Sequence, residues 1–178
     1  RIYENAIKAL DQNWENSFNE YLSRNKSLEN YNYGVSYWHY QYARSFMKDQ
    51  NLTGVLKTGR EFAFAKARTH FSSQQIYQQL LMSLSLQRAG EVATAEKIVE
   101  GLRQSAVNSR ENGMYWKENV TGYNWYSSDI ETQALAIETF SEVGTNEKNV
   151  EELKVWLLQN KRTNQWKSTK ATADATYA

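Results

Sequence analysis

Two acidic residues beside an aromatic stretch have the residue types and spacing that could do chemistry. Asp129 and Glu131 lie two residues apart and follow a segment, 111–126, that contains two tryptophans and three tyrosines. A pair of carboxylates can serve as general acid and base on a glycosidic bond. One hypothesis is therefore a carbohydrate-active enzyme, a glycosidase or lyase, that uses Asp129 or Glu131.

A structural interpretation of the same residues competes with this hypothesis, and we favour it. Ser128 and Glu131 have the spacing of a capping box, and Asp129 would complement the positive end of a helix dipole. We expect both carboxylates near the surface at a helix start, bound to backbone donors. Ser128 and Ser168 are predicted N-caps. Accordingly, we assign no catalytic, cofactor-binding or metal-binding residue.

Other reactive groups are sparse in the sequence. The chain has no cysteine, so a thiolate nucleophile or a thiolate metal site is excluded within it. The two histidines, His39 and His70, have no partner at metal-ligand spacing. We expect His39 to pack among core aromatic residues and His70 to end a helix, where a cation is favoured.

Three tryptophans, Trp116, Trp125 and Trp166, could form a stacking surface for a sugar or a peptide. The alternative is that they anchor loops onto helix ends, because a tryptophan buries a large ring and keeps a polar N–H. We favour the anchoring role.

Composition narrows the class of protein. The 178 residues carry a net charge of +1, which provides no basic face for nucleic acid. No apolar run is long enough to span a bilayer, and no cofactor motif is present. The chain lacks proline, which breaks helix interiors, so a nearly all-helical chain is expected. Its length fits one domain, 1–178. Since both ends fall inside helical patterns, we expect this domain to be a fragment.

Apolar side chains recur every three or four residues along most of the sequence, a spacing typical of amphipathic helices. The first such run extends from Tyr3 to Leu22. Six further helices are predicted over about 35–48, 55–68, 72–89, 91–108, 128–143 and 146–160, and a last one begins at Ser168. Ser72 and Gln75 have capping-box spacing at the start of the fourth. The segment 111–126 is predicted as an ordered loop or a short hairpin.

Two segments of the sequence are related to one another. Trp116-Lys117 precedes the Ser128 helix, and Trp166-Lys167 precedes the Ser168 helix. Helices rich in small residues also alternate with amphipathic ones. Such repetition suggests helical hairpins arranged around an axis, with the small-residue helices inside. The predicted fold class is therefore all-α, an α/α toroid or a part of one.

Three segments between Trp125 and Ala178 form a recognisable pattern. They are Ser128-Asp-Ile-Glu-Thr-Gln-Ala-Leu-Ala-Ile-Glu-Thr-Phe, Val155-Trp-Leu-Leu-Gln-Asn-Lys-Arg and Trp166-Lys-Ser-Thr-Lys-Ala-Thr-Ala-Asp-Ala. This pattern resembles the thioester-bearing helical domain of bacterial α2-macroglobulins. The resemblance extends more weakly to Tyr37–Phe46, as in forms from Bacteroidetes-like bacteria.

The resemblance implies an α/α toroid within a large periplasmic or extracellular, envelope-associated chain. Its partners would be other domains of the same chain and the endopeptidases that the parent protein traps. Three departures stand out: Lys170 replaces the usual glutamine, no cysteine is present for a thioester, and 111–127 contains no histidine. We therefore expect a domain that is not an enzyme and has no thioester chemistry in this segment.

Overall fold

The computed structural model describes residues 2–47, 51–120, 129–144, 146–163 and 169–178. Within these ranges the chain is mostly helical, which confirms the all-α prediction. The helices are α1 (Ile2–Leu22), α2 (Val35–Arg44), α3 (Gly54–His70), α4 (Ile76–Arg88), α5 (Val92–Ser105), α6 (Asp129–Glu142), α7 (Glu147–Thr163) and α8 (Thr169–Tyr177). Short 3₁₀ turns lie at Phe71–Ser73 and Lys117–Val120. The strands β1 (Val107–Ser109) and β2 (Gly113–Tyr115) form one antiparallel hairpin.

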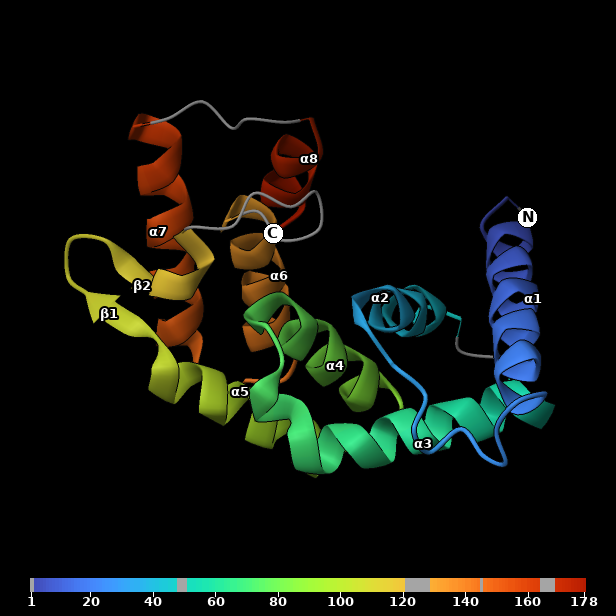
Figure 1. Cartoon of the computed structure of the whole chain (residues 1–178). Helices are drawn as coiled ribbons and strands as arrows, with labels where there is room; N and C mark the ends of the chain where they lie inside the picture. The colour runs from blue at the N-terminus through green and yellow to red at the C-terminus, as the bar shows by residue number, and fades with distance from the viewer. Residues whose placement is uncertain (1, 48–50, 121–128, 145, 164–168) are drawn as a thin grey trace. The chain divides into compact units, whose positions relative to one another are not determined.

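The chain divides into two compact units, residues 1–71 and 72–178. The first unit contains α1, α2 and α3, and the second contains α4 to α8 with the hairpin (Figure 1). Each unit has its own buried apolar residues.

Aromatic rings fill the core of the N-terminal unit. Phe18 of α1 is fully buried and contacts Tyr31, Tyr33 and Tyr37 at ring-centroid distances of 5.0–6.2 Å. Edge-to-face and tilted ring pairs of this kind are favourable beyond the apolar area that they bury. Tyr37 belongs to the aromatic run in 35–48 that predicted a buried helix, whereas Tyr31 and Tyr33 come from the segment before α2.

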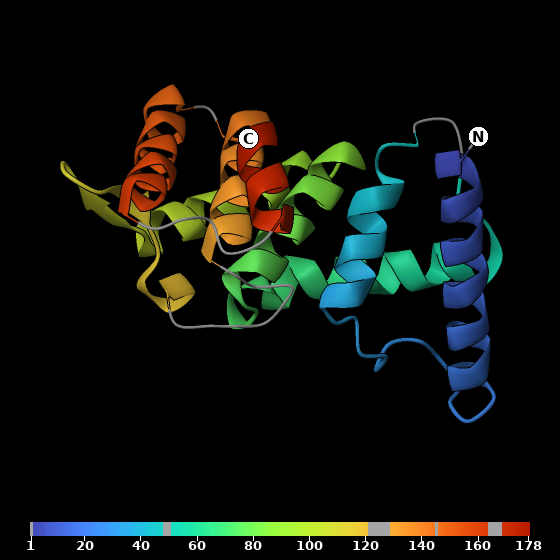
Figure 2. The ribbon, with the colours of Figure 1, turned by 90° about the horizontal axis from the view of Figure 1, so that it is seen from above.

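In the second unit, α6 is the central helix. Figure 1 and Figure 2 show α4, α7 and α8 around it, and α6 contacts all three. In α6, every residue from Ile130 to Ile137 is buried. In α4, nine of the ten residues from Tyr77 to Leu86 are buried. Helices buried all round are interior helices. By contrast, α5 buries one face, through Ala95, Ile98, Val99 and Leu102. A half-buried helix thus lies between two buried ones from α4 to α6, and a toroid remains a prediction.

Several helix ends differ from the sequence prediction. The fourth helix begins at Ile76 because Phe71–Ser73 forms a 3₁₀ turn and Gln75 is extended, so the Ser72 capping box is wrong. The second ends at Arg44, where the Ser45 hydroxyl donates to the Tyr42 carbonyl. The seventh continues to Thr163 rather than ending at residue 160.

The fifth helix ends at Ser105, three residues earlier than predicted, because the next residues pair as a strand. Val107 lies opposite Tyr115 in the hairpin. The Ser109 hydroxyl accepts hydrogen bonds from the amides of Glu111 and Asn112 and so closes the turn. Of the two alternatives predicted for 111–126, a loop or a hairpin, the structure contains a hairpin whose first strand precedes residue 111, while residues 121–126 lie outside the described ranges.

The turn between α4 and α5 follows a known helix-ending motif. The Glu91 amide donates to the Leu86 carbonyl and the Gly90 amide to the Gln87 carbonyl, while Gly90 has a φ of +89°. This is the Schellman arrangement, in which glycine tolerates the left-handed conformation. It lets α5 fold back on α4 directly, and the two helices form a packed hairpin.

Candidate functional site

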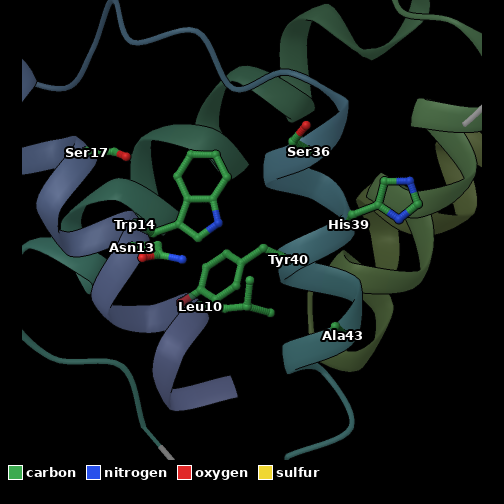
Figure 3. Close-up of a pocket in the computed structure, with 8 residues that line it drawn as sticks. All are labelled: Leu10, Asn13, Trp14, Ser17, Ser36, His39, Tyr40 and Ala43. Atoms are coloured by element: carbon green, nitrogen blue, oxygen red, sulfur yellow. The ribbon is translucent and has the colours of Figure 1, made fainter. Parts of the chain in front are cut away.

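A pocket of about 510 Å³ lies in the N-terminal unit between α1 and α2 (Figure 3). Its α1 wall is formed by Leu10, Asn13, Trp14 and Ser17, and its α2 wall by Ser36, His39, Tyr40 and Ala43. On each helix these four residues follow the spacing i, i+3, i+4, i+7, which places them on one face. Two helix faces thus oppose one another across the pocket.

The rings of Trp14 and Tyr40 lie between the two helices (Figure 3), with centroids 5.8 Å apart and planes inclined by 30°. Tyr37 contacts the indole of Trp14 edge-on, with ring centroids 5.0 Å apart, and Tyr37 is fully buried. Trp14 itself is half-buried, so part of its ring remains accessible. The pocket therefore has an aromatic wall that the core holds in place.

A charged pair fixes Tyr40. The Tyr40 hydroxyl donates to Asp11 Oδ1 at 2.6 Å, and Arg44 Nη1 donates to Asp11 Oδ2 at 2.8 Å. Arg44 is 8% exposed and Asp11 19%, so this ion pair is largely withdrawn from water. Burial raises the pKa of the Tyr40 phenol, and its hydrogen bond to Asp11 and the charge of Asp11 raise it further. Tyr40 consequently stays neutral at physiological pH.

The rim of the pocket is polar and uncharged. Asn13 and Ser36 are exposed, and neither side chain makes a hydrogen bond within the described part of the chain. Ser17 is hydrogen-bonded to Tyr31, and His39 is half-buried on α2. None of the eight described residues that line the pocket is a lysine, arginine, aspartate or glutamate.

Asp129 and Glu131 occupy different surroundings, and one of them is not where the sequence predicted. Asp129 is half-buried at the start of α6, and its Oδ1 accepts a hydrogen bond from the Ile130 amide at 3.0 Å. Glu131 is only 4% exposed, so the prediction that it lies near the surface is wrong. The reason is that α6 has neighbours on several sides, which encloses even its first turn.

Glu131 shares its surroundings with groups from two other helices. Burial raises the pKa of the Tyr77 phenol on α4, and the negative charges of Asp174 on α8 and Glu131 raise it further. These three residues therefore interact electrostatically across the interior helices of the second unit. Tyr77, Glu131 and Asp174 are far apart in the sequence, so no local motif could have predicted that they interact.

The remaining candidate residues have structural surroundings or lie outside the described ranges. Trp116 is 1% exposed, and its Nε1 donates to the Leu102 carbonyl near the end of α5, as an anchoring role requires. His70 is the last residue of α3 and is exposed. Trp125, Trp166, Ser128 and Ser168 lie outside the described residues, so their predicted roles stay predictions.

Two further properties concern the described residues as a whole. Their side chains include no group of three or more histidines, aspartates or glutamates arranged to hold a metal ion. Among the described helices, none combines the length and the apolar character needed to cross a membrane.

Sequence reasoning missed the α1–α2 pocket, although the signal was present. Polar or small residues stand at Asn13, Ser17, Ser36 and Ala43, on helix faces that otherwise carry large rings. Small side chains opposite large rings leave space between helices. Whether these two helix faces lie opposite one another depends on how α1 and α2 pair, which neither helix sequence shows alone.

Comparisons with protein-family models, with curated proteins and with solved structures find no match to this chain.

Proposed function

We propose that this chain is a non-catalytic helical domain of a bacterial α2-macroglobulin-like envelope protein that traps endopeptidases. In this proposal the domain docks against other domains of the same chain and carries no thioester. The parent protein would act in the periplasm or outside the cell.

The observation that supports this proposal best is the placement of the family-like segments. The segments that begin at Ser128 and Ser168 supply α6 and α8, which contact one another, while the segment around Trp156 supplies α7, packed on α6. In a toroid of helical hairpins the inner helices would be next-but-one neighbours in sequence, as α6 and α8 are here. The pairing of α4 with both α5 and α6 follows the same rule.

The positions of Asp129 and Glu131 weigh against the alternative, a glycosidase or lyase. Residues two apart on a helix do not face one another. Asp129 binds the backbone of its own helix, and Glu131 is buried. An acid–base pair needs two carboxyl groups on either side of an accessible glycosidic bond, and these two residues do not offer that arrangement.

The proposal is tested on the parent protein with trypsin and elastase. A trapped endopeptidase is enclosed, so it should lose activity on casein and keep activity on a small chromogenic peptide. We expect this divergence at equimolar parent protein, and the isolated 178-residue chain should change neither activity. Unaltered casein cleavage, or parallel loss of both activities, would contradict trapping.

A second measurement concerns the chemistry of the segment. A thioester needs a cysteine sulfur as leaving group, and this chain has no cysteine. We therefore expect radiolabelled methylamine, which opens thioesters, to leave the chain unlabelled. Covalent incorporation into it would overturn this part of the proposal.

A further inference from the structure

We propose that the pocket between α1 and α2 binds a neutral hexopyranose ring, with the half-buried Trp14 indole as the stacking ring, the buried Tyr40 ring packed beside it, and Asn13 and Ser36 as hydrogen-bonding groups (Figure 3). The α2 wall of this site falls within the weaker part of the family resemblance, 37–46, but the proposal does not depend on protease trapping.

Charge sets the first limit on the ligand. The residues that line the pocket carry no formal charge when His39 is neutral. The charged pair that holds Tyr40, Asp11 and Arg44, has its charged atoms 2.8 Å apart, so these two charges compensate each other. A phosphate or a cation would lose its hydration here without gaining a counter-charge. The ligand is therefore neutral.

The polar rim sets the second limit. A purely apolar ligand would cover the Asn13 amide and the Ser36 hydroxyl and leave them without hydrogen bonds, which is unfavourable. A hexopyranose satisfies both requirements. One face of its ring exposes C–H groups that can pack on the negative face of an aromatic ring, and hydroxyl groups surround its edge.

The geometry favours binding because the wall is already ordered. Tyr37 packs edge-on against the Trp14 indole, and the Asp11–Arg44 pair fixes Tyr40, whose ring packs on the same indole. Little side-chain freedom remains to be lost when a ligand binds, and this preorganisation improves affinity. A volume of about 510 Å³ also lies within the range of small-molecule sites.

The test uses the 178-residue chain labelled with ¹⁵N and titrated with methyl β-glucopyranoside and, separately, with cellotriose. The Trp14 indole N–H resonance is assigned by its loss in Trp14→Phe. We expect this resonance to shift at millimolar sugar. Binding of both sugars means that one ring suffices, and binding of the trisaccharide alone means that the pocket takes a ring within a chain; either result supports the proposal.

Variants separate a specific site from a general effect. Asn13→Ala removes an exposed amide and should weaken binding about three- to tenfold. Asn19→Ala changes an exposed asparagine of the same helix outside the pocket, and it should leave affinity unchanged. Trp14→Ala should abolish binding, with circular dichroism to verify folding. If that variant does not fold, Asn13→Ala and Asn19→Ala decide the matter.

The proposal is overturned if neither sugar shifts the Trp14 resonance at tens of millimolar. Equal weakening by Asn13→Ala and Asn19→Ala would also overturn it. So would binding of free indole at this site without binding of either sugar, because the pocket would then select an apolar ligand.

Discussion

At the scale of single residues, Gln133 illustrates how one buried amide can join three elements. Its Nε2 donates to the Met114 carbonyl of β2 at 2.8 Å and to the Leu153 carbonyl of α7 at 3.0 Å. Gln133 lies on α6 and is fully buried, so water does not compete for these bonds. The hairpin and α7 are thereby both connected to the central helix.

Replacement of Gln133 by leucine should lower the free energy of unfolding by about 2–3 kcal/mol, because two buried carbonyls lose their donor. Urea unfolding followed by circular dichroism measures this change. The matched control is the adjacent Thr132→Val. Thr132 is equally buried, but its hydroxyl has no hydrogen-bond partner among the described residues. Its loss should leave stability unchanged or raise it, and equal destabilisation by both variants would refute the assignment.

The sequence predicted the chemistry of some residues and not of others. Trp116 could be assigned as an anchor because its indole combines a large apolar ring, which favours burial, with an N–H that needs a hydrogen-bond acceptor. The burial of Glu131 could not be predicted, because capping-box spacing describes only contacts within one helix. Whether a first turn is enclosed depends on neighbours such as α4 and α8, which lie about 40 or more residues away in sequence.

At the scale of elements, Gly113 determines how closely the hairpin approaches α7. It has a φ of +72°, and a Cβ added there would overlap the Glu152 carbonyl oxygen and lie 2.9 Å from the Trp156 amide nitrogen. The contact involves backbone atoms of a helix, which cannot move aside as a flexible side chain could. Only glycine fits this position.

Gly113→Ala should therefore destabilise the chain by about 3 kcal/mol, since overpacking adds to the strain of a positive φ. Gly90→Ala is the control: its φ is +89°, but nothing lies within 4 Å of the added Cβ. We expect only the conformational cost there, about 1 kcal/mol. Thermal unfolding of both variants checks the difference, and equal losses would show that the contact with α7 is unimportant.

Helix positions followed from apolar periodicity, but helix ends did not. Apolar periodicity indicates which face of a helix is buried. The same spacing can continue through residues beyond the end of the helix, so it does not indicate where the helix ends. Val107 satisfied the helical spacing of the fifth helix, yet it pairs with Tyr115 because the Ser109 turn brings the two segments together. The α1–α2 pocket escaped prediction for a similar reason, since it arises from the pairing of helices and not from either helix alone.

At the scale of the whole molecule, the buried tyrosines make stability depend on alkaline pH. Burial is the largest cause of the raised pKa of the Tyr33, Tyr37 and Tyr40 phenols in the N-terminal unit, and neighbouring phenols or carboxylates contribute. In the unfolded chain these groups ionise near pH 10. Above about that pH the unfolded state has lost protons that the folded state retains, so stability falls as pH rises.

Each such tyrosine should contribute a decrease of about 1.4 kcal/mol per pH unit above about pH 10. Urea unfolding at several pH values, with phenolate absorbance, measures the slope. Tyr33→Phe loses the hydrogen bond to the Leu28 carbonyl and should be less stable at neutral pH, yet its alkaline slope should be shallower by one tyrosine. An unchanged slope would mean that Tyr33 ionises normally in the folded chain.

The helix pairings have a consequence for how the chain is made. The principal contacts join helices that are neighbours or next-but-one neighbours in sequence: α1 with α3, α4 with α5, α6 with α7, and α6 with both α4 and α8. Chains with such local pairings close short loops first and fold rapidly. During synthesis, each helix would find its main partner among segments that have just left the ribosome. The α1–α3 unit can therefore pack while α6 to α8 are still being translated, which shortens the time that its aromatic core is exposed.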